Sequence, residues 1–111
     1  MSSILNVALG GIQRGVKGFL TTANNVANFN TDGYRSRKYN PGSDTVTVRD
    51  PGFDPDAVRS DLGGGDFPIN DVDLARELVQ MKLDEHAIKA NITVAKVADR
   101  TLGELLDILA K

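Results

Sequence analysis

The sequence predicts a mainly α protein: an elongated, coiled-coil-like antiparallel pair of long N- and C-terminal helices, joined by an extended connector with a possible short β-hairpin. Two apolar repeats, in residues 5–26 and 74–109, predict the helices. All four prolines and a run of three glycines fall in residues 35–70, which predicts the connector. The chain therefore divides into an N-terminal helix with an asparagine-rich motif (1–34), a connector (35–70) and a C-terminal helix (71–111).

The first repeat advances by three or four residues at each step, through Leu5, Leu9, Ile12, Val16, Phe19, Ala23 and Val26. This spacing predicts a helix over residues 3–29, with Ser2 or Ser3 as its N-cap. The helix contains four glycines, each of which weakens it by about 1 kcal/mol relative to alanine: Gly10, Gly11, Gly15 and Gly18. Because glycine also lets another backbone come close, we expect neighbouring helices to pack tightly against this one.

The end of the first helix reads ANNVANFNTDGY, residues 23–34, with four asparagines in seven positions. Asparagine is unfavourable inside helices because its side chain competes for backbone hydrogen bonds. Asn24 and Asn28 share a helix face, and their amides are able to cap carbonyl groups or bond a neighbouring backbone. Residues 31–33 predict a tight turn in which Gly33 adopts positive φ. An ordinary helix end needs one or two such amides, so we expect the others to make contacts outside the helix.

The connector holds one strand-like segment. Residues 45–48 (TVTV) alternate in polarity, and Asp50-Pro51-Gly52 follows as a turn signal. We therefore expect an extended segment with one hairpin and no second core.

The second repeat predicts a helix of roughly 54 Å from residue 74 to residue 109. Nine of its eleven positions are apolar: Leu74, Leu78, Met81, Glu85, Ile88, Ile92, Ala95, Asp99, Leu102, Leu106 and Leu109. Asp71 and Asp73 place negative charge at its N-terminus, as the helix dipole favours.

Flanking apolar residues widen the stripe of this second helix: Val79, Leu83, Ala87, Val94, Ala98 and Leu105. A stripe this wide implies burial against more than one helix, and the shorter first helix covers only part of it. Other copies or other subunits are the simplest source of the missing cover.

Composition argues against several functional classes. The net charge of −2 gives no field suited to nucleic acid or to an anionic membrane. The absence of cysteine excludes disulfides, thiolate metal sites and cysteine nucleophiles. The N-terminus has no basic region before its apolar part, and its apolar run is too short for a membrane span. We expect no nucleic acid, no small-molecule substrate and no direct membrane insertion.

Candidate catalytic residues are few, so we expect no enzymatic activity, cofactor or metal. His86, the only histidine, has no obvious partners at helical spacing, which favours a solvated or interface role. Gly63–Gly65 is not followed by the lysine of a phosphate loop. The connector carboxylates lack the spacing of a calcium loop and its terminal glutamate, which favours a solvated loop: Asp50, Asp54, Asp56, Asp61 and Asp66. The small basic cluster at residues 35–38 is followed by acidic residues, which argues against nucleic-acid binding.

Both ends of the chain resemble the bacterial flagellar axial proteins, especially the rod and hook proteins. Their N-terminal signature, A-N-N-I-A-N-x-x-T-x-G-Y, is matched by residues 23–28 and 31–34. Their C-terminal signature, N-V-D-L-x-x-E-x-V-x-M followed by E-A-N, is matched by residues 71–74 (DVDL), Glu77, Val79, Met81 and Ala90-Asn91. The chain departs from the family pattern at Asp32, where proline is frequent, and near Ile88, where an aromatic residue is common.

The resemblance implies a structural subunit of the flagellar basal-body rod, whose terminal helices form the inner layer of a tubular assembly. The short connector makes the chain most like a small proximal rod protein. Its implied location is the periplasm-spanning rod, reached by flagellar type III export without a cleaved signal peptide. Its implied partners are copies of itself, other axial proteins and the export apparatus. Within the tube, the amide-rich helix ends would lie among neighbouring subunits and fix their angle and register.

From the stripes and the motifs together, we expect subunit contacts at Leu5, Leu9, Ile12, Val16, Phe19, Asn24, Asn25, Asn28, Thr31, Gly33, Tyr34, Leu74, Leu78, Met81, Ile88, Asn91, Ile92, Ala95, Leu102, Leu106 and Leu109. Two alternatives stay open. One is a soluble helical adaptor or export chaperone that forms a small closed oligomer. The other is a metal-dependent enzyme that uses the connector carboxylates.

Overall fold

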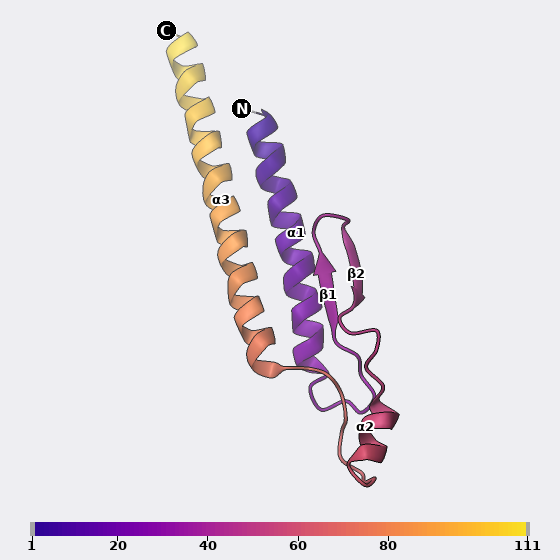
Figure 1. Ribbon diagram of the computed structural model, residues 1–111. Helices are drawn as coiled ribbons and strands as arrows, with labels where there is room; N and C mark the ends of the chain where they lie inside the picture. Colours follow the sequence, from indigo (N-terminus) through magenta and orange to yellow (C-terminus); the bar gives the residue numbers. More distant parts are fainter. Residues whose placement is uncertain (1, 111) are drawn as a thin grey trace.

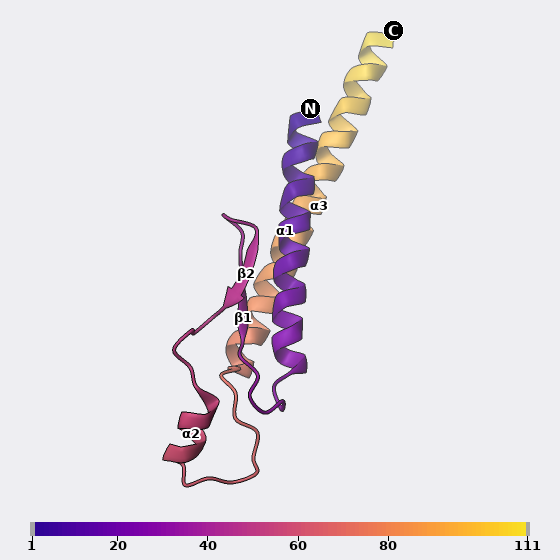
Figure 2. The ribbon, with the colours of Figure 1, turned by 90° about the vertical axis from the view of Figure 1, so that its right-hand side faces the viewer.

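The computed structural model describes residues 2–110 and confirms the pair of long terminal helices. The elements in chain order are α1 (Ser2–Ala27), β1 (Arg37–Asn40), β2 (Thr45–Val48), α2 (Pro55–Asp61) and α3 (Leu74–Ala110). In Figure 1, α1 and α3 run antiparallel side by side, the hairpin lies along α1, and α2 lies beyond the lower end of the pair. The view turned by 90° in Figure 2 shows the hairpin standing off one side of the helix pair.

The molecule is long and has little core. Its principal extents are 79 × 22 × 14 Å and its radius of gyration is 20.5 Å, against about 13 Å for a compact domain of this length. Its accessible surface is 7407 Å², whereas a compact monomer of this mass exposes about 5,900 Å². The buried apolar residues are Ala8, Ile69, Val72 and Ala98. The fold therefore leaves much of its apolar surface uncovered.

Helix α1 begins at Ser2 and ends at Ala27, two residues before the predicted end. Ser2 and Ser3 both lie inside the helix, so the prediction that one of them is the N-cap is wrong. At the other end the Asn28 side chain donates to the Asn24 carbonyl over 2.8 Å, as expected of a capping amide. Gly33 has a φ of +76°, which confirms the predicted turn, and its N–H donates to the Ile69 carbonyl over 2.8 Å.

The strand predicted at residues 45–48 is present as β2, and its partner β1, which the sequence did not indicate, precedes it. Strands β1 and β2 pair antiparallel, with Arg37 opposite Val48 and Asn40 opposite Thr45. An ion pair of 2.8 Å between Lys17 and Asp44 ties the loop of the hairpin to α1. The turn after β2 also forms, since the Gly52 N–H donates to the Asp50 side chain.

The sequence reasoning missed α2. Its signals are nevertheless present: Asp54 caps the N–H of Asp56 over 3.0 Å, and Pro55 is the first helical residue. None of its side chains is buried. Arg59 holds it in place by pairing with Asp32 and donating to the carbonyls of Gly65 and Phe67.

The seam between α1 and α3 is formed by small residues, and not by the predicted apolar stripe of α1. A Cβ atom added at Gly11 would lie 2.6 Å from the Asn91 amide, and one at Gly15 would lie 2.6 Å from Ile88 Cγ1. At Gly18 it would lie 3.3 Å from the Asp84 carboxylate. The same spacing continues in both directions along α1 and defines its seam residues: Ala8, Gly11, Gly15, Gly18, Thr22 and Asn25. Gly11 and Gly15 are half-buried and the other four are buried. The tight packing expected of the glycines is therefore provided by α3 of the same chain.

On α3, the residues that contact α1 coincide with only every second position of the apolar stripe predicted for residues 74–109. Asp84, Ile88 and Asn91 contact the glycines, and Glu77 contacts Asn25. The seam and the predicted stripe of α3 have Leu74, Met81, Ile88 and Ala95 in common, at seven-residue intervals. Among the other positions of the predicted stripe, Leu78, Ile92, Leu106 and Leu109 are exposed.

Candidate functional site: a buried clasp and an open apolar face

Asn25 lies at the centre of a buried polar cluster that joins the end of α1, the hairpin and the start of α3. Its side chain is wholly buried and uses all of its hydrogen-bonding capacity. The Nδ2 atom donates to the Arg37 carbonyl over 2.7 Å and to Glu77 Oε2 over 3.1 Å. The Oδ1 atom accepts from the Arg37 N–H over 2.9 Å and from the Tyr34 hydroxyl over 2.8 Å. The side-chain amide thus pairs with Arg37 as a peptide group of a neighbouring strand would.

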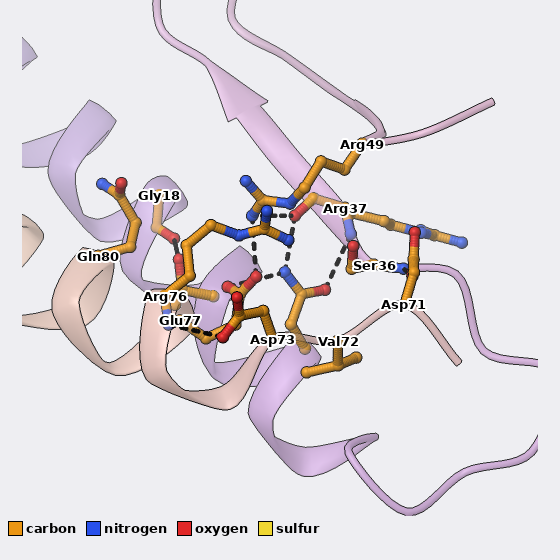
Figure 3. A network of polar contacts seen from close by, with 12 residues as sticks. Gly18, Ser36, Arg37, Arg49, Asp71, Val72, Asp73, Arg76, Glu77 and Gln80 are labelled. Atoms are coloured by element: carbon orange, nitrogen blue, oxygen red, sulfur yellow. Dashed lines mark hydrogen bonds and ion pairs between the residues drawn. The ribbon is translucent and has the colours of Figure 1, made fainter. Parts of the chain in front are cut away.

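Glu77 supplies the charge of this cluster. Its carboxylate is wholly buried on α3 and pairs with Arg49 over 2.9 Å. Figure 3 shows Arg49 reaching from beyond the strand of the hairpin toward Glu77. The backbone at Arg49 is itself fixed, because its N–H donates to the Ser36 carbonyl over 2.9 Å. We call the five residues the clasp: Asn25, Tyr34, Arg37, Arg49 and Glu77.

The clasp corrects the expectation for Asn25. The sequence placed this amide at a contact with a neighbouring subunit, but the amide is enclosed and satisfied within its own chain. Tyr34 is used in the same way, and burial raises the pKa of its hydroxyl. The Thr31 hydroxyl donates to Asn28 Oδ1 over 3.0 Å, so these two residues also bond each other. Asn24 is exposed and stays available to a partner.

Two clasp residues, Arg37 and Arg49, were not predicted as site residues. Glu77 was recognised as part of the C-terminal motif but given no role. The position of Glu77 beside the apolar stripe was a signal of its role, since a carboxylate that is buried needs a hydrogen-bonding or charged partner. Nothing in the sequence indicated that Arg49, 28 positions earlier, would be that partner.

Beside the seam, the predicted stripe of α1 forms part of an open apolar face. At 3.6 residues per turn this stripe lies about a quarter turn from the glycines, on the side away from Lys17 and the hairpin. Leu9 is 53% exposed and Val16 is 41% exposed. On α3, Leu78 and Ile92 flank the seam on the same side and are 52% and 37% exposed. We call this surface the open face: Leu5, Leu9, Ile12, Val16, Phe19, Leu78 and Ile92. Leu5, Ile12 and Phe19 are half-buried, and the other four are exposed.

Helix α3 carries a further exposed apolar stripe, on the side away from the open face. Its members recur at helical spacing and are all exposed: Val79, Leu83, Val94, Val97, Leu105 and Ile108. Helix α3 therefore presents apolar side chains on two sides that α1 does not cover, as the width of its stripe in the sequence implied.

Asp84 is a partly buried carboxylate in the seam that lacks a full set of hydrogen bonds within residues 2–110. One of its oxygens accepts a hydrogen bond from Gln80 over 3.1 Å, and the other is buried against Gly18 with no hydrogen bond from residues 2–110. Burial raises the pKa of this carboxyl group. Because the folded-state pKa lies above the unfolded one, the contribution of Asp84 to stability is full below the unfolded pKa and is lost as the pH rises through the folded pKa.

We therefore expect Asp84→Asn to remove a pH-dependent loss of stability. Urea unfolding of both proteins between about pH 3 and pH 7 checks this, with the window placed around the ordinary aspartate pKa of about 4. The free energy of unfolding of the wild type should fall relative to that of the variant as the pH rises. The difference isolates Asp84, because all other carboxylates are common to both proteins. A difference that stays constant across this range would show that Asp84 titrates normally.

No protein-family model matches this chain, and no curated protein matches it at a significant level. Within residues 2–110, no helix is long and apolar enough to cross a membrane. The same residues contain no cluster of three or more histidine, aspartate or glutamate side chains placed to hold a metal ion.

Proposed function

We propose that this protein is a structural subunit of the bacterial flagellar basal-body rod that polymerises through its terminal helices into a tubular axial assembly. The observation that carries the proposal is the open face. A chain that closes its helix pair through glycines, and leaves leucine, isoleucine and valine uncovered on both helices, is built to be buried by other chains. The elongated shape and the excess of exposed surface point the same way.

The clasp also supports the proposal, because it joins the two sequence motifs that resemble those of the axial proteins. Asn25 and Glu77 belong to the two segments that resemble the axial signatures. They lie 52 positions apart in the sequence, yet their side chains form a direct hydrogen bond. The N-terminal motif also contributes Tyr34 to the same cluster. A shared structural task accounts for the presence of both motifs in one chain: they set the ends of the two helices in one relative position. A rigid helix pair is what a repeating tubular lattice requires of its subunit.

The proposal is tested by placing a charge on the open face. We expect Ile92→Asp to abolish motility and rod formation, because assembly would bury an unpaired carboxylate at a cost of several kcal/mol per subunit. Since Ile92 is exposed in the single chain, the variant should still fold. Thr93→Asp is the matched control, as it introduces the same charge at an exposed neighbouring position. The measurements are swimming and the yield of purified basal bodies.

Export is measured separately by immunoblots of the periplasm and the culture medium, where the Ile92→Asp protein should still appear. If Ile92→Asp swims normally, the open face is not an assembly surface and the proposal fails. If the wild-type protein instead occurs in the cell as a discrete dimer or tetramer and is absent from purified basal bodies, the adaptor or chaperone alternative replaces it.

A further inference from the structure

A groove of mixed polar and apolar lining lies on the hairpin side of the molecule, between α1, α3 and the hairpin. It has a volume of about 550 Å³, and Gly11, Gly15 and Gly18 line it along α1. Its basic residues are Arg14, Lys38 and Arg49, and its one acidic residue is Asp84. Because Arg49 is already paired with Glu77, the groove lining keeps two other cations, Arg14 and Lys38, against the single carboxylate of Asp84. Both cations are exposed at its edge. Arg14 also lies near the exposed carboxylate of Asp44, whose pKa it helps to lower.

Helix α3 extends past the start of α1. Gly18 lies against Asp84, Gly15 against Ile88 and Gly11 against Asn91, so the two helices advance in step and Ser2 lies level with about residue 100. Residues 102–110 therefore extend past α1, as the C-terminal end does in Figure 1. We call this segment the overhang. It carries five large apolar residues, Leu102, Leu105, Leu106, Ile108 and Leu109, and four of them are exposed.

The charge and length of the overhang match the groove. Its only charged residues are Glu104 and Asp107, which are both acidic. Helical spacing puts them on the side away from most of its leucines, so a leucine face turned into the groove leaves both acids near its edge. The overhang is about 14 Å long, and the groove follows α1 from Val7 to Thr22 over about 22 Å.

We propose that the overhang of a second copy of this chain docks in the groove, with its apolar side toward the glycines and with Glu104 and Asp107 paired to Arg14 and Lys38. A chain cannot fill its own groove, because α3 is one continuous helix that carries its overhang away from it. The contact is head-to-tail, so each docked copy presents a new overhang and a new groove, and the array does not close at two members. This inference rests on the proposed function, since it names one contact through which the subunit would polymerise.

Charge reversal on each side tests the pairing. We expect Arg14→Glu with Lys38→Glu, and separately Glu104→Lys with Asp107→Lys, to weaken self-association of the full chain by roughly tenfold. An equimolar mixture of the two double variants should recover wild-type association, because reversed grooves then meet reversed overhangs. Sedimentation equilibrium measures both effects. Arg76→Glu with Lys96→Glu is the matched control for the groove variant, since it lowers the net charge by the same amount at exposed positions outside the groove. A mixture that associates no better than its components would overturn the pairing.

The position of docking is tested by cross-linking, which the absence of natural cysteine makes specific. A short bis-maleimide should join an Ile108→Cys chain to a Pro41→Cys chain, because Pro41 lines the groove. A reaction of Ile108→Cys with Val16→Cys instead would overturn docking in the groove while leaving assembly through the open face intact. A chain that stays monomeric at every concentration would also overturn it. Capture of Pro41→Cys in cells by a different flagellar protein would mean that the occupant is not a second copy, and would overturn it too. The basal-body assay of the Ile92 variant judges the proposed function separately.

Discussion

Replacing Asn25 with alanine is expected to lower the free energy of unfolding by about 3–5 kcal/mol, one of the two largest effects expected in this chain. The substitution deletes four hydrogen bonds at once. It leaves the Arg37 N–H and carbonyl without these partners, and it removes one of the two groups that stabilise the buried carboxylate of Glu77. The gain in helix propensity from asparagine to alanine is at most about 0.7 kcal/mol and cannot offset these losses.

Urea or thermal unfolding followed by circular dichroism measures this effect on the monomeric chain. Asn24→Ala is the matched control: it makes the same change one residue earlier, at an exposed side chain, and should be neutral or slightly stabilising. The comparison also separates two roles of the amides. An Asn25→Ala protein that is as stable as the wild type but fails to assemble would mean that this amide acts between subunits after all.

Gly15→Ala is expected to destabilise the helix pair by about 1–3 kcal/mol, although alanine is the better helix former by about 1 kcal/mol. The added Cβ would lie 2.6 Å from Ile88 Cγ1, a separation that requires Ile88 to leave its rotamer or α3 to move away from α1. Because side chains along the seam interlock, such a movement loosens contacts on both sides of the substituted turn. Thermal unfolding should show a lower midpoint and a broader transition.

Two further substitutions separate the effect of the steric clash at Gly15 from the effect of helix propensity. Gly103→Ala meets no atom within 4 Å and should stabilise α3 by up to about 1 kcal/mol through helix propensity alone. In an Ile88→Ala background the clashing Cγ1 atom is absent, so Gly15→Ala should there be neutral or stabilising. If Gly15→Ala stabilises the unmodified chain as much as Gly103→Ala does, the two helices are not in the close contact that the structure gives.

The long elements followed from local signals. An apolar repeat of 3.5 residues, free of proline, predicts a helix wherever it occurs, and both helices were placed to within two residues at each end. Residues 45–48 were identified as a strand by their alternation, and Gly33 as a residue of positive φ by its place in a turn motif. Helix α2 was missed because seven residues are too few to show a period, although Asp54 and Pro55 form a recognisable start signal.

By itself the sequence determined the helices, the hairpin and the presence of more apolar surface than two helices can bury. The tertiary structure decided which face of α1 meets α3. Periodicity shows which residues share a face but does not show which neighbour covers that face. Glycines 11, 15 and 18 give no apolar signal, yet they allow the two helices to approach so closely that Asn91, Ile88 and Asp84 fill the space where side chains would be. The larger side chains of the α1 stripe therefore stay partly uncovered, and Leu9 and Val16 are exposed. The partners of Asn25 were likewise fixed only by the tertiary structure, because Arg37 and Glu77 come from separate elements to bond this amide, and Arg49 pairs with Glu77 from the segment after β2.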